Sequence, residues 1–348
     1  MQSRVYLDHN ATTPLRPEAR VAMIDALDAV GNPSSVHLEG RAAKAIIEKA
    51  RSQISNAFGV GARDIIFTSG ATEAAALGLH GRGFKAAGIE HDAVSAWVEP
   101  DLNVVAGEVI VEVPQKTALQ LANSETGIIQ KLPESLGFCD MTQAFGKIST
   151  SFAWTGALMA CASAHKLGGP KGIGCLLLQP GQTISAQLQG GGQEMGRRAG
   201  TENVVGIAGF GAAAEAAAKD LADGKWRAIE KLRNKLEKVL EASGKPITYI
   251  GKGILRLPNT ACFSAPGWKG ETQVMQMDLA GFAISAGSAC SSGKVKSSRA
   301  LEAMGYGTNI ANSAVRVSLG LLTTETEIQQ FATTWLSAYD SFLARRAA

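Results

Sequence analysis

The residue with the clearest chemical potential is Lys166, in the stretch Ser163-Ala-His165-Lys166-Leu-Gly-Gly-Pro. An apolar run precedes this stretch and glycines follow it, which predicts a loop at the end of a buried strand. Desolvation there would lower the pKa of the amine enough for Schiff-base formation, and Ser163 and His165 would be positioned to hold a phosphate. A lysine in a loop is more often a solvated charge, so this interpretation depends on three other segments.

The first of these segments is Thr68-Ser-Gly70-Ala71-Thr72-Glu73, which follows a strand-like run and opens a predicted helix. Exposed backbone N–H groups and the positive end of a helix dipole favour a phosphate at such a place, and Thr72 adds a hydroxyl. The same pattern also describes an ordinary helix cap.

The other two segments supply groups for an aromatic cofactor. Asp140 follows a strand-like run and could pair with a protonated pyridine nitrogen, and Gln143 could hydrogen-bond a phenolic oxygen. His91, after Glu90, could stack on the ring face. Taken singly, the aspartate could equally cap a turn and the histidine could be structural.

One cysteine differs from the rest in its surroundings. Cys290 lies in the polar stretch SAGSACSSGKVKSS, whereas the other four have apolar neighbours typical of buried, reduced thiols: Cys139, Cys161, Cys175 and Cys262. No C-x-x-C pair suggests a zinc site or a disulfide. Cys290 is therefore the candidate nucleophile.

Composition excludes several broad classes. The 348 residues carry 34 basic and 31 acidic side chains, a net charge of +3 without a basic block, which argues against nucleic-acid or membrane-surface binding. The start resembles no secretory signal and no run approaches about 20 apolar residues. We expect a soluble cytoplasmic protein.

The elements that must position these residues follow an α/β pattern. Apolar spacing predicts a helix over 41–58, and strand, glycine turn and helix then recur, with strands at 64–68, 107–114 and 174–180 and around Cys139 and Ala160. Such alternation favours a mostly parallel sheet. An almost continuous helical stretch from 203 to about 243 leads to short strands and a closing helix from Thr324, a pattern typical of a second, smaller domain.

Together these motifs resemble the cysteine desulfurases of iron–sulfur cluster assembly, in the class V aminotransferase group of fold-type I pyridoxal-phosphate (PLP) enzymes. The resemblance runs from Tyr6 to about Thr326 and rests on ordered stretches: YLDHNATTP, NPSSVHLEGR, FTSGATEA, NSETGIIQ, DMTQAFGK, SAHKLGGPKGIG, GGGQEMGRRAGTEN, GSACSSG and AVRVSLG. It implies a large domain (15–222) with a mostly parallel seven-stranded sheet flanked by helices. A small α/β domain (1–14 and 223–348) would carry the cysteine loop.

The resemblance also implies roles for individual residues. PLP would bind Lys166, with Asp140 at the pyridine nitrogen, Gln143 at the phenolic oxygen and His91 on the ring. Its phosphate would be held by the Ala71 and Thr72 segment, Ser163 and His165, and by Thr201 from the neighbouring subunit of a homodimer. The substrate pocket would include Asn10, Asn123 and Arg316, with Arg316 gripping the carboxylate.

The implied reaction converts L-cysteine to L-alanine. Lys166, with His91, would move the α-proton, and the Cys290 thiolate would take the sulfur as a persulfide for a sulfur-acceptor protein such as an iron–sulfur scaffold. Lys294, Lys296 or His91 could assist ionisation of the thiol, and the sequence does not choose between them. The loop resembles the type with a longer catalytic segment.

Three questions stay open at this point. The spacing of His91, Asn123 and Asp140 is compressed, and residues 94–121 match the family poorly. A selenocysteine lyase, another PLP-dependent lyase or aminotransferase, or a non-catalytic scaffold paralogue are the alternative functions. The sulfur acceptor could equally serve tRNA modification or molybdenum-cofactor synthesis.

Overall fold

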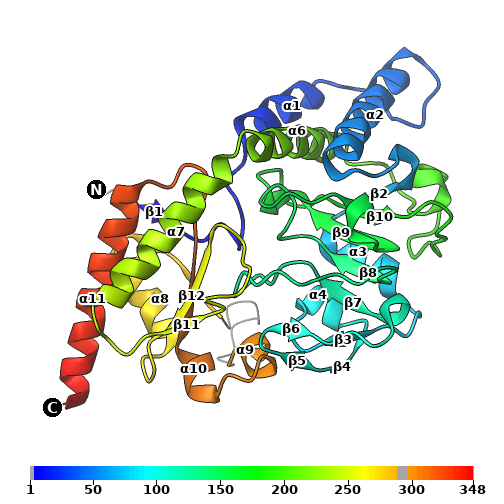
Figure 1. Ribbon diagram of the computed structural model, residues 1–348. Helices are drawn as coiled ribbons and strands as arrows, with labels where there is room; N and C mark the ends of the chain where they lie inside the picture. Colours follow the sequence, from blue (N-terminus) through cyan, green and yellow to red (C-terminus); the bar gives the residue numbers. More distant parts are fainter. Residues whose placement is uncertain (1–3, 288–296, 348) are drawn as a thin grey trace.

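The computed structural model describes residues 4–287 and 297–347, so Cys290, Lys294 and Lys296 lie outside the described residues. Two bodies of secondary structure lie side by side in Figure 1, each with its own hydrophobic core. None of the helices in the described ranges is long and apolar enough to cross a membrane.

The larger body is built on a sheet in which seven of the described strands lie in line. Five are hydrogen-bonded in the order β2 (Ile65–Thr68), β10 (Gly174–Leu178), β9 (Met159–Ser163), β8 (Phe138–Asp140) and β7 (Ala118–Gln120). A parallel bridge between Lys85 and Thr117 adds the parallel pair β3 (Lys85–Ala87) and β4 (Glu99–Leu102) at the β7 edge. Only β10 runs against the other six, which confirms the mostly parallel seven-stranded sheet.

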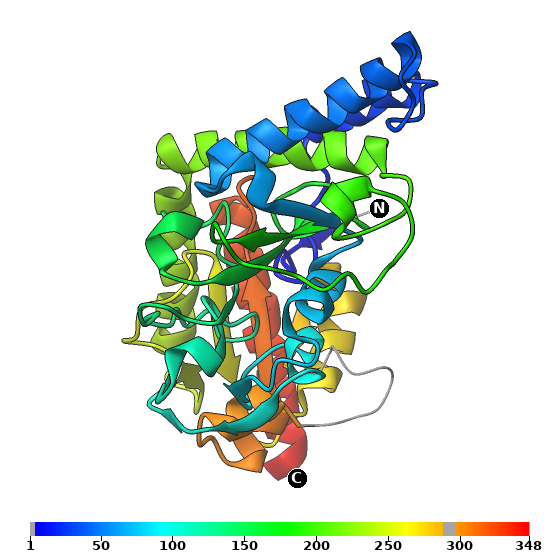
Figure 2. The same cartoon turned by 90° about the vertical axis from the view of Figure 1, so that its right-hand side faces the viewer.

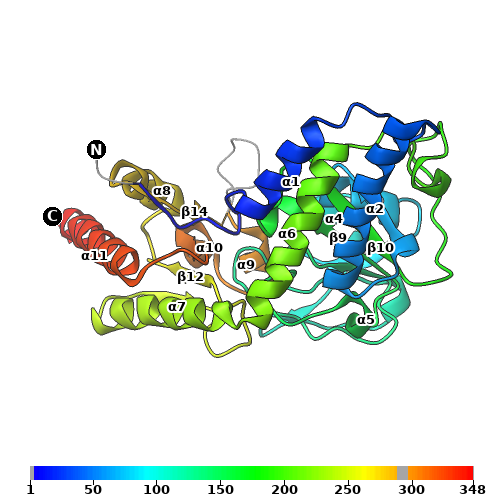
Figure 3. The same cartoon turned by 90° about the horizontal axis from the view of Figure 1, so that it is seen from above.

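Both faces of this sheet are buried, which explains why its strands read as continuous apolar runs. Ile65 and Phe67 point into the core beneath α2 (Leu38–Phe58) and α6 (Val204–Ala222), and Ile66 points into the core beneath α3 (Ala71–Leu79). Seen from above in Figure 3, α1 (Pro17–Leu27), α6 and α2 lie side by side over the sheet. The short helices α4 (Asp92–Ser95) and α5 (Phe152–Thr155) complete the body.

The predicted strand over 107–114 is wrong. This segment begins with β6 (Glu108–Val109), which pairs with β5 (Val104–Val105) in a hairpin whose strands have two residues each. The strand that joins the large sheet is β7, further along the chain. Gly107 turns the hairpin with φ of +83°, and its carbonyl accepts from Gln130 Nε2 at 2.7 Å. Because Gln130 Oε1 also accepts from Val109 N at 2.9 Å, the buried glutamine completes the pairing that a neighbouring strand would otherwise provide.

The smaller body has an antiparallel sheet in the order β11 (Thr248–Ile250), β12 (Thr260–Ser264), β15 (Ala314–Ser318) and β14 (Ser285–Ala286). Its helices are α7 (Lys225–Ala242), α8 (Gly270–Leu279), α9 (Arg299–Ala303), α10 (Thr308–Ser313) and α11 (Glu325–Ala347). Trp268, Trp335 and Tyr339 pack together at ring distances of 5.2–5.5 Å in its core. The N-terminal strand β1 (Val5–Tyr6) pairs with β13 (Phe282–Ala283) on this body.

The helical stretch predicted over 203–243 is two helices, because Gly224 adopts a left-handed conformation with φ of +69° between α6 and α7. Figure 1 shows that α6 lies on the larger body and α7 on the smaller one. The break is consistent with the expected domain division at residues 222/223, which stays a prediction.

Candidate active site

A cavity of about 690 Å³ lies where the carboxyl ends of the parallel strands meet the N-terminal segment and the edge of the small sheet. This is the usual place for ligands in an open α/β sheet. Ten of the residues predicted from the sequence line it: Asn10, Ala71, Thr72, His91, Asp140, Gln143, Ser163, His165, Lys166 and Arg316.

Lys166 ends a 3₁₀ turn, η3 (Ala164–Lys166), that follows β9 directly. Its Nζ donates to the carbonyl oxygens of Asn10 at 2.7 Å and Ala11 at 2.9 Å. The N-terminal segment also clamps the turn, because Thr13 N donates to His165 O and Thr13 Oγ1 donates to Lys166 O. The N-terminal segment therefore holds both the amine and the turn that carries it at the cavity wall.

An anion cradle lies beside this amine. The first-turn N–H groups of α3, at Ala71 and Thr72, have no partners within the helix and face the cavity. Gly70 leaves the approach to these N–H groups open. A Cβ at this position would project into open space, with Ser163 Oγ at 4.0 Å as its nearest neighbour. Burial, followed by Lys166, lowers the pKa of His165 to about 4, so its ring is neutral at neutral pH. Its Nδ1 lies 3.2 Å from Thr12 Oγ1.

Asp140 and Gln143 form the floor of the cavity. One oxygen of Asp140 accepts from Thr142 N at 2.9 Å, and the residue is only partly buried, so the carboxylate can still accept from a ligand. Gln143 donates through Nε2 to Asn10 O at 2.8 Å and accepts at Oε1 from a buried lysine, Lys147, at 2.6 Å. These donors and acceptors fit PLP: the cradle suits its phosphate, Asp140 its pyridinium nitrogen and Lys166 its aldehyde carbon.

Arg316 lies on β15 at the opposite wall. Its Nη2 donates to Asp8 Oδ1 at 2.6 Å and its Nη1 to Ser124 O at 3.0 Å. Its buried Nε has no hydrogen-bond partner among the described residues. Ser285 Oγ holds the other oxygen of Asp8 at 2.8 Å. The guanidinium is thus fixed in place and keeps donor capacity for a small carboxylate.

Three predicted residues lie elsewhere or have a second role. Asn123 does not line the cavity: its Oδ1 accepts from the backbone of Glu125 and Thr126, and its Nδ2 donates to Ile89 O, so it shapes the 123–126 turn. Thr201 lines a separate depression of about 220 Å³ that shares Ser69 and Gly172 with the cavity. His91 lines the cavity and also caps α4, with its Nδ1 accepting from Ala93 N.

Sequence reasoning missed three charged residues near or in the site. Lys147 is buried beneath Gln143, Asp8 pairs with Arg316, and Glu125 lines the cavity beside Gly287. Glu125 Oε2 accepts from Ser298 Oγ at 2.5 Å, and burial raises the pKa of this carboxyl to about 7. All three belong to the stretches DMTQAFGK, YLDHNATTP and NSETGIIQ, but nothing local in those stretches signals burial.

The chain is similar to known proteins over most of its length. The family model for class-V aminotransferases matches residues 5–99 and 108–331, and the gap between them covers most of β4 and all of β5. A cysteine desulfurase from Frankia sp. (strain EuIK1) is 37% identical, with 94% of this chain and 89% of the relative covered. A cysteine desulfurase IscS from Dictyoglomus turgidum is 34% identical, with 94% and 92% covered.

Solved structures give the same assignment. The NifS-like protein from Rickettsia africae ESF-5 superposes with a TM-score of 0.87 at 30% identity, with 97% of this chain and 99% of that chain covered. A second NifS-like protein superposes with a TM-score of 0.85 at 31% identity, with the same coverage. On its sequence, its sheet topology and the residues around its cavity, this chain belongs to the class-V aminotransferase family.

Proposed function

We propose that this protein is a PLP-dependent cysteine desulfurase that converts L-cysteine to L-alanine and passes the sulfur to Cys290. The observation that carries the proposal is the convergence of Lys166, the α3 cradle, Asp140 and Arg316 on one cavity. The named desulfurases at 31–37% identity support it.

The residues around the cavity divide into two groups. Lys166, Asp140, Gln143 and His91 would hold the ring, and the N–H groups at Ala71 and Thr72 with Ser163 and His165 would hold the phosphate. When bound, PLP supplies a conjugated ring that withdraws electrons from the amino acid joined to it.

The substrate would be held by its carboxylate. Arg316 would use the donor capacity left by Asp8 and Ser124 for this group, because a guanidinium fork matches a carboxylate better than an ammonium does. Asn10, with its side chain pointing to Ser124 O and its carbonyl to Lys166, lies between these two anchor points.

Lys166 would then take the proton from the substrate Cα, with His91 as the second candidate base. The Cys290 thiolate would form a bond to the substrate sulfur as the Cβ–S bond breaks. The electron pair of the broken bond stays with Cβ, which gains a proton and becomes the methyl group of alanine, while Lys166 returns a proton to Cα. The sulfur remains on Cys290 as a persulfide, ready for a thiolate on an acceptor protein of an iron–sulfur or other thio-cofactor pathway.

The test is to mix the purified, PLP-loaded protein with L-cysteine and a thiol reductant, and to measure alanine and sulfide. Equal amounts of both products are expected from the native chain, and none above background from Cys290→Ser. Cys175→Ser is the matched control, because this buried thiol lies on β10 outside the cavity lining and should not affect turnover beyond its effect on stability. Turnover that survives in Cys290→Ser would instead indicate a β-lyase or an aminotransferase.

Selenocysteine provides a second arm of the same experiment. A selenocysteine lyase would release selenide and alanine from L-selenocysteine while leaving L-cysteine unchanged. A scaffold paralogue would take up no PLP and stay colourless. Either result would replace the proposed function.

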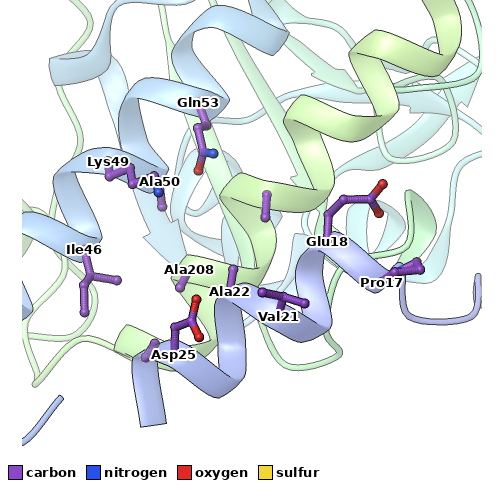
Figure 4. Close-up of a pocket in the computed structure, with 12 residues that line it drawn as sticks. Pro17, Glu18, Val21, Ala22, Asp25, Ile46, Lys49, Ala50, Gln53 and Ala208 are labelled. Atoms are coloured by element: carbon purple, nitrogen blue, oxygen red, sulfur yellow. The ribbon is translucent and has the colours of Figure 1, made fainter. Parts of the chain in front are cut away.

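We further propose a homodimer in which Thr201 reaches the phosphate site of the partner subunit. In Figure 2 α1 and the start of α2 project beyond the rest of the larger body, and this projection exposes apolar side chains: Val21, Ile24, Leu27, Val30, Val36 and Leu38. A depression of about 580 Å³ between α1, α2 and α6 adjoins them (Figure 4). Exposed apolar patches of this kind are typical of subunit interfaces.

Sedimentation velocity tests the dimer. The native chain should sediment as a dimer, and Val30→Asp with Val36→Asp should yield monomers with reduced PLP affinity. Leu322→Asp replaces an equally exposed apolar residue on the other body and should leave the dimer intact. A native monomer would contradict this proposal.

A further inference from the structure

Lys147 is a lysine buried at the junction of the two bodies. Its side chain is only 3% exposed, and its Nζ donates to Gln143 Oε1 at 2.6 Å and to Asn10 Oδ1 at 3.1 Å. Both partners are neutral amides. Burial, followed by the nearby Lys166 and Arg316, holds the pKa of this amine well below its ordinary value. A buried amine without a counter-charge destabilises the fold, so a contribution to stability does not explain a lysine at this position.

The contacts of Lys147 determine how two amide groups are oriented. An ammonium group has three donors and no acceptor, and a neutral amine still has two N–H groups, the number that Lys147 uses here. In the structure Lys147 directs both of these N–H groups to amide oxygens, so the atom of Gln143 that faces it is the oxygen. Amide oxygen and nitrogen are nearly identical in shape, so their hydrogen-bond partners alone decide which way the group points.

Asn10 has independent support for its own orientation. Its Oδ1 also accepts from Asn259 Nδ2 at 3.0 Å, and its Nδ2 donates to Thr260 Oγ1 at 2.9 Å. Thr260 Oγ1 in turn donates to Asn259 Oδ1 at 3.1 Å, which closes a ring of three side chains. Gln143 has no such ring: among the described residues its side chain is hydrogen-bonded to Lys147 and to Asn10 O. Losing Lys147 should therefore disturb Gln143 more than Asn10.

With Oε1 fixed on Lys147, the NH₂ group of Gln143 lies on the side of Asn10 O, the same carbonyl that receives Lys166 Nζ. The glutamine thus presents a donor, not an acceptor, to the cavity that it lines. A donor there suits an anionic oxygen on a ring joined to Lys166, whereas a flipped amide would present an oxygen and repel it.

We propose that Lys147 is a positioning residue of the desulfurase site, which fixes the Gln143 amide with its NH₂ group toward the cofactor's ring oxygen. This inference rests on the proposed function, because it takes Gln143 as the partner of that oxygen. It assigns the lysine of the DMTQAFGK stretch a role through Gln143 and not through contact with the substrate.

The experiment measures the pH midpoint of the visible absorption band that forms when PLP binds the full-length protein. A hydrogen-bond donor to the ring oxygen stabilises the deprotonated form of that oxygen. It therefore lowers the pKa of the proton shared between the ring oxygen and the Lys166 nitrogen. Lys147→Met should therefore raise the midpoint by about one pH unit, as expected for one lost hydrogen bond to a charged oxygen. The affinity for PLP, measured by fluorescence titration of the cofactor-free protein, should fall about tenfold.

A double-mutant cycle separates positioning from the effect of a nearby charge. In the Gln143→Ala background Lys147→Met should leave the midpoint unchanged, because the residue through which it acts is gone. An equal rise in both backgrounds would show that Lys147 acts as a bare charge and would overturn the proposal. An unchanged midpoint in the single variant would overturn it as well.

Folding provides a further check. Lys147→Met removes a poorly compensated buried amine, so its cofactor-free form should unfold at the same or a higher urea concentration than the native chain. If that variant does not fold, Lys147→Leu carries the same test, since a leucine there likewise offers Gln143 no hydrogen-bond partner. If the native chain forms no visible band and no alanine, the proposed function has failed. If it forms both and the pH midpoint is the same in the native chain and the Lys147 variant, only this inference has failed.

Discussion

Two clusters of buried charge in this protein are arranged in opposite ways. Between α2 and β2, Arg51 Nη2 donates to Glu194 Oε1 at 2.6 Å and its Nη1 donates to Ile65 O. Glu194 Oε2 also accepts from Phe67 N at 3.0 Å, and the guanidinium lies 4.6 Å from the Phe67 ring centre. Around the cavity, Lys147 donates only to neutral amides and the Nε of Arg316 finds no partner among the described residues.

The difference indicates which cluster maintains the fold and which one binds. A buried pair whose charges and hydrogen bonds are mutually satisfied has nothing left to offer a ligand. Cationic groups with spare donors, beside an open helix N-terminus, create a positive environment that an anion can complete. Substitutions in the first cluster should therefore lower stability, and substitutions in the second should lower turnover or affinity.

The strongest test of the binding cluster is Lys166→Ala. We expect alanine formation from L-cysteine to fall by at least about 10⁴-fold, because both the attachment point for PLP and a base are lost. The urea unfolding free energy should change by less than about 1 kcal/mol. Lys131→Ala, at an exposed lysine outside the cavity lining, is the control and should reduce turnover far less. A large loss of stability in Lys166→Ala would contradict the division into a cluster that maintains the fold and a cluster that binds a ligand.

The strongest test of the structural cluster is Glu194→Gln. It leaves Arg51 buried with only the exposed carboxylate of Glu48, 3.6 Å away, as a counter-charge, so the unfolding free energy should fall by about 3–5 kcal/mol. Glu48→Gln is the control, because Glu48 faces the same guanidinium from a side chain that is 54% exposed, and should cost less than about 0.5 kcal/mol. Similar losses in both variants would mean that burial does not decide the strength of this pair.

Arg316→Lys should weaken substrate binding while preserving the charge. A lysine cannot span Asp8, Ser124 and a substrate carboxylate at once, so KM for L-cysteine should rise at least about tenfold, with a smaller change in kcat. Steady-state kinetics of alanine release measures both constants. An unchanged KM would place the carboxylate site elsewhere in the cavity.

Glu125→Gln should have an effect that depends on pH. Because the pKa of Glu125 is about 7 in the folded chain and about 4.3 in an unfolded one, the native state retains a proton that the unfolded state loses. Its stabilising contribution is fully present below pH about 4.3 and is lost as pH rises through about 7, on the order of 2 kcal/mol. Urea unfolding between pH 5 and pH 8 should show this loss in the native chain, and the loss should be about 2 kcal/mol smaller in the variant.

Much of the fold could be predicted because its signals are local. The apolar runs at Ile65–Thr68 and Gly174–Leu178 point to strands buried on both faces, and the glycine turn before Ala71 points to a helix N-terminus. The lysine and aspartate at strand ends were identified as site residues for the same reason. The structure brings them to one cavity, as the parallel topology requires.

The remainder depends on contacts distant in sequence. Lys147 meets Asn10 across 137 positions and Arg316 meets Asp8 across 308, so neither partnership leaves a local pattern. The apolar run after Gly107 predicts a strand of the sheet, but it forms part of a hairpin whose hydrogen bonding is completed by the buried Gln130. Asn123 has the family's residue type, but its amide is engaged by its own turn.

The reversed direction of β10 has a consequence for how Lys166 can move. Since β9 and β10 are adjacent and antiparallel, the segment that carries the lysine is the bend of a hairpin whose two arms are both anchored in the large sheet. The backbone at this bend cannot slide along the strand direction without breaking ladder bonds on both arms. The backbone of Lys166 therefore stays in place, and the amine changes position by rotation about its own side-chain bonds.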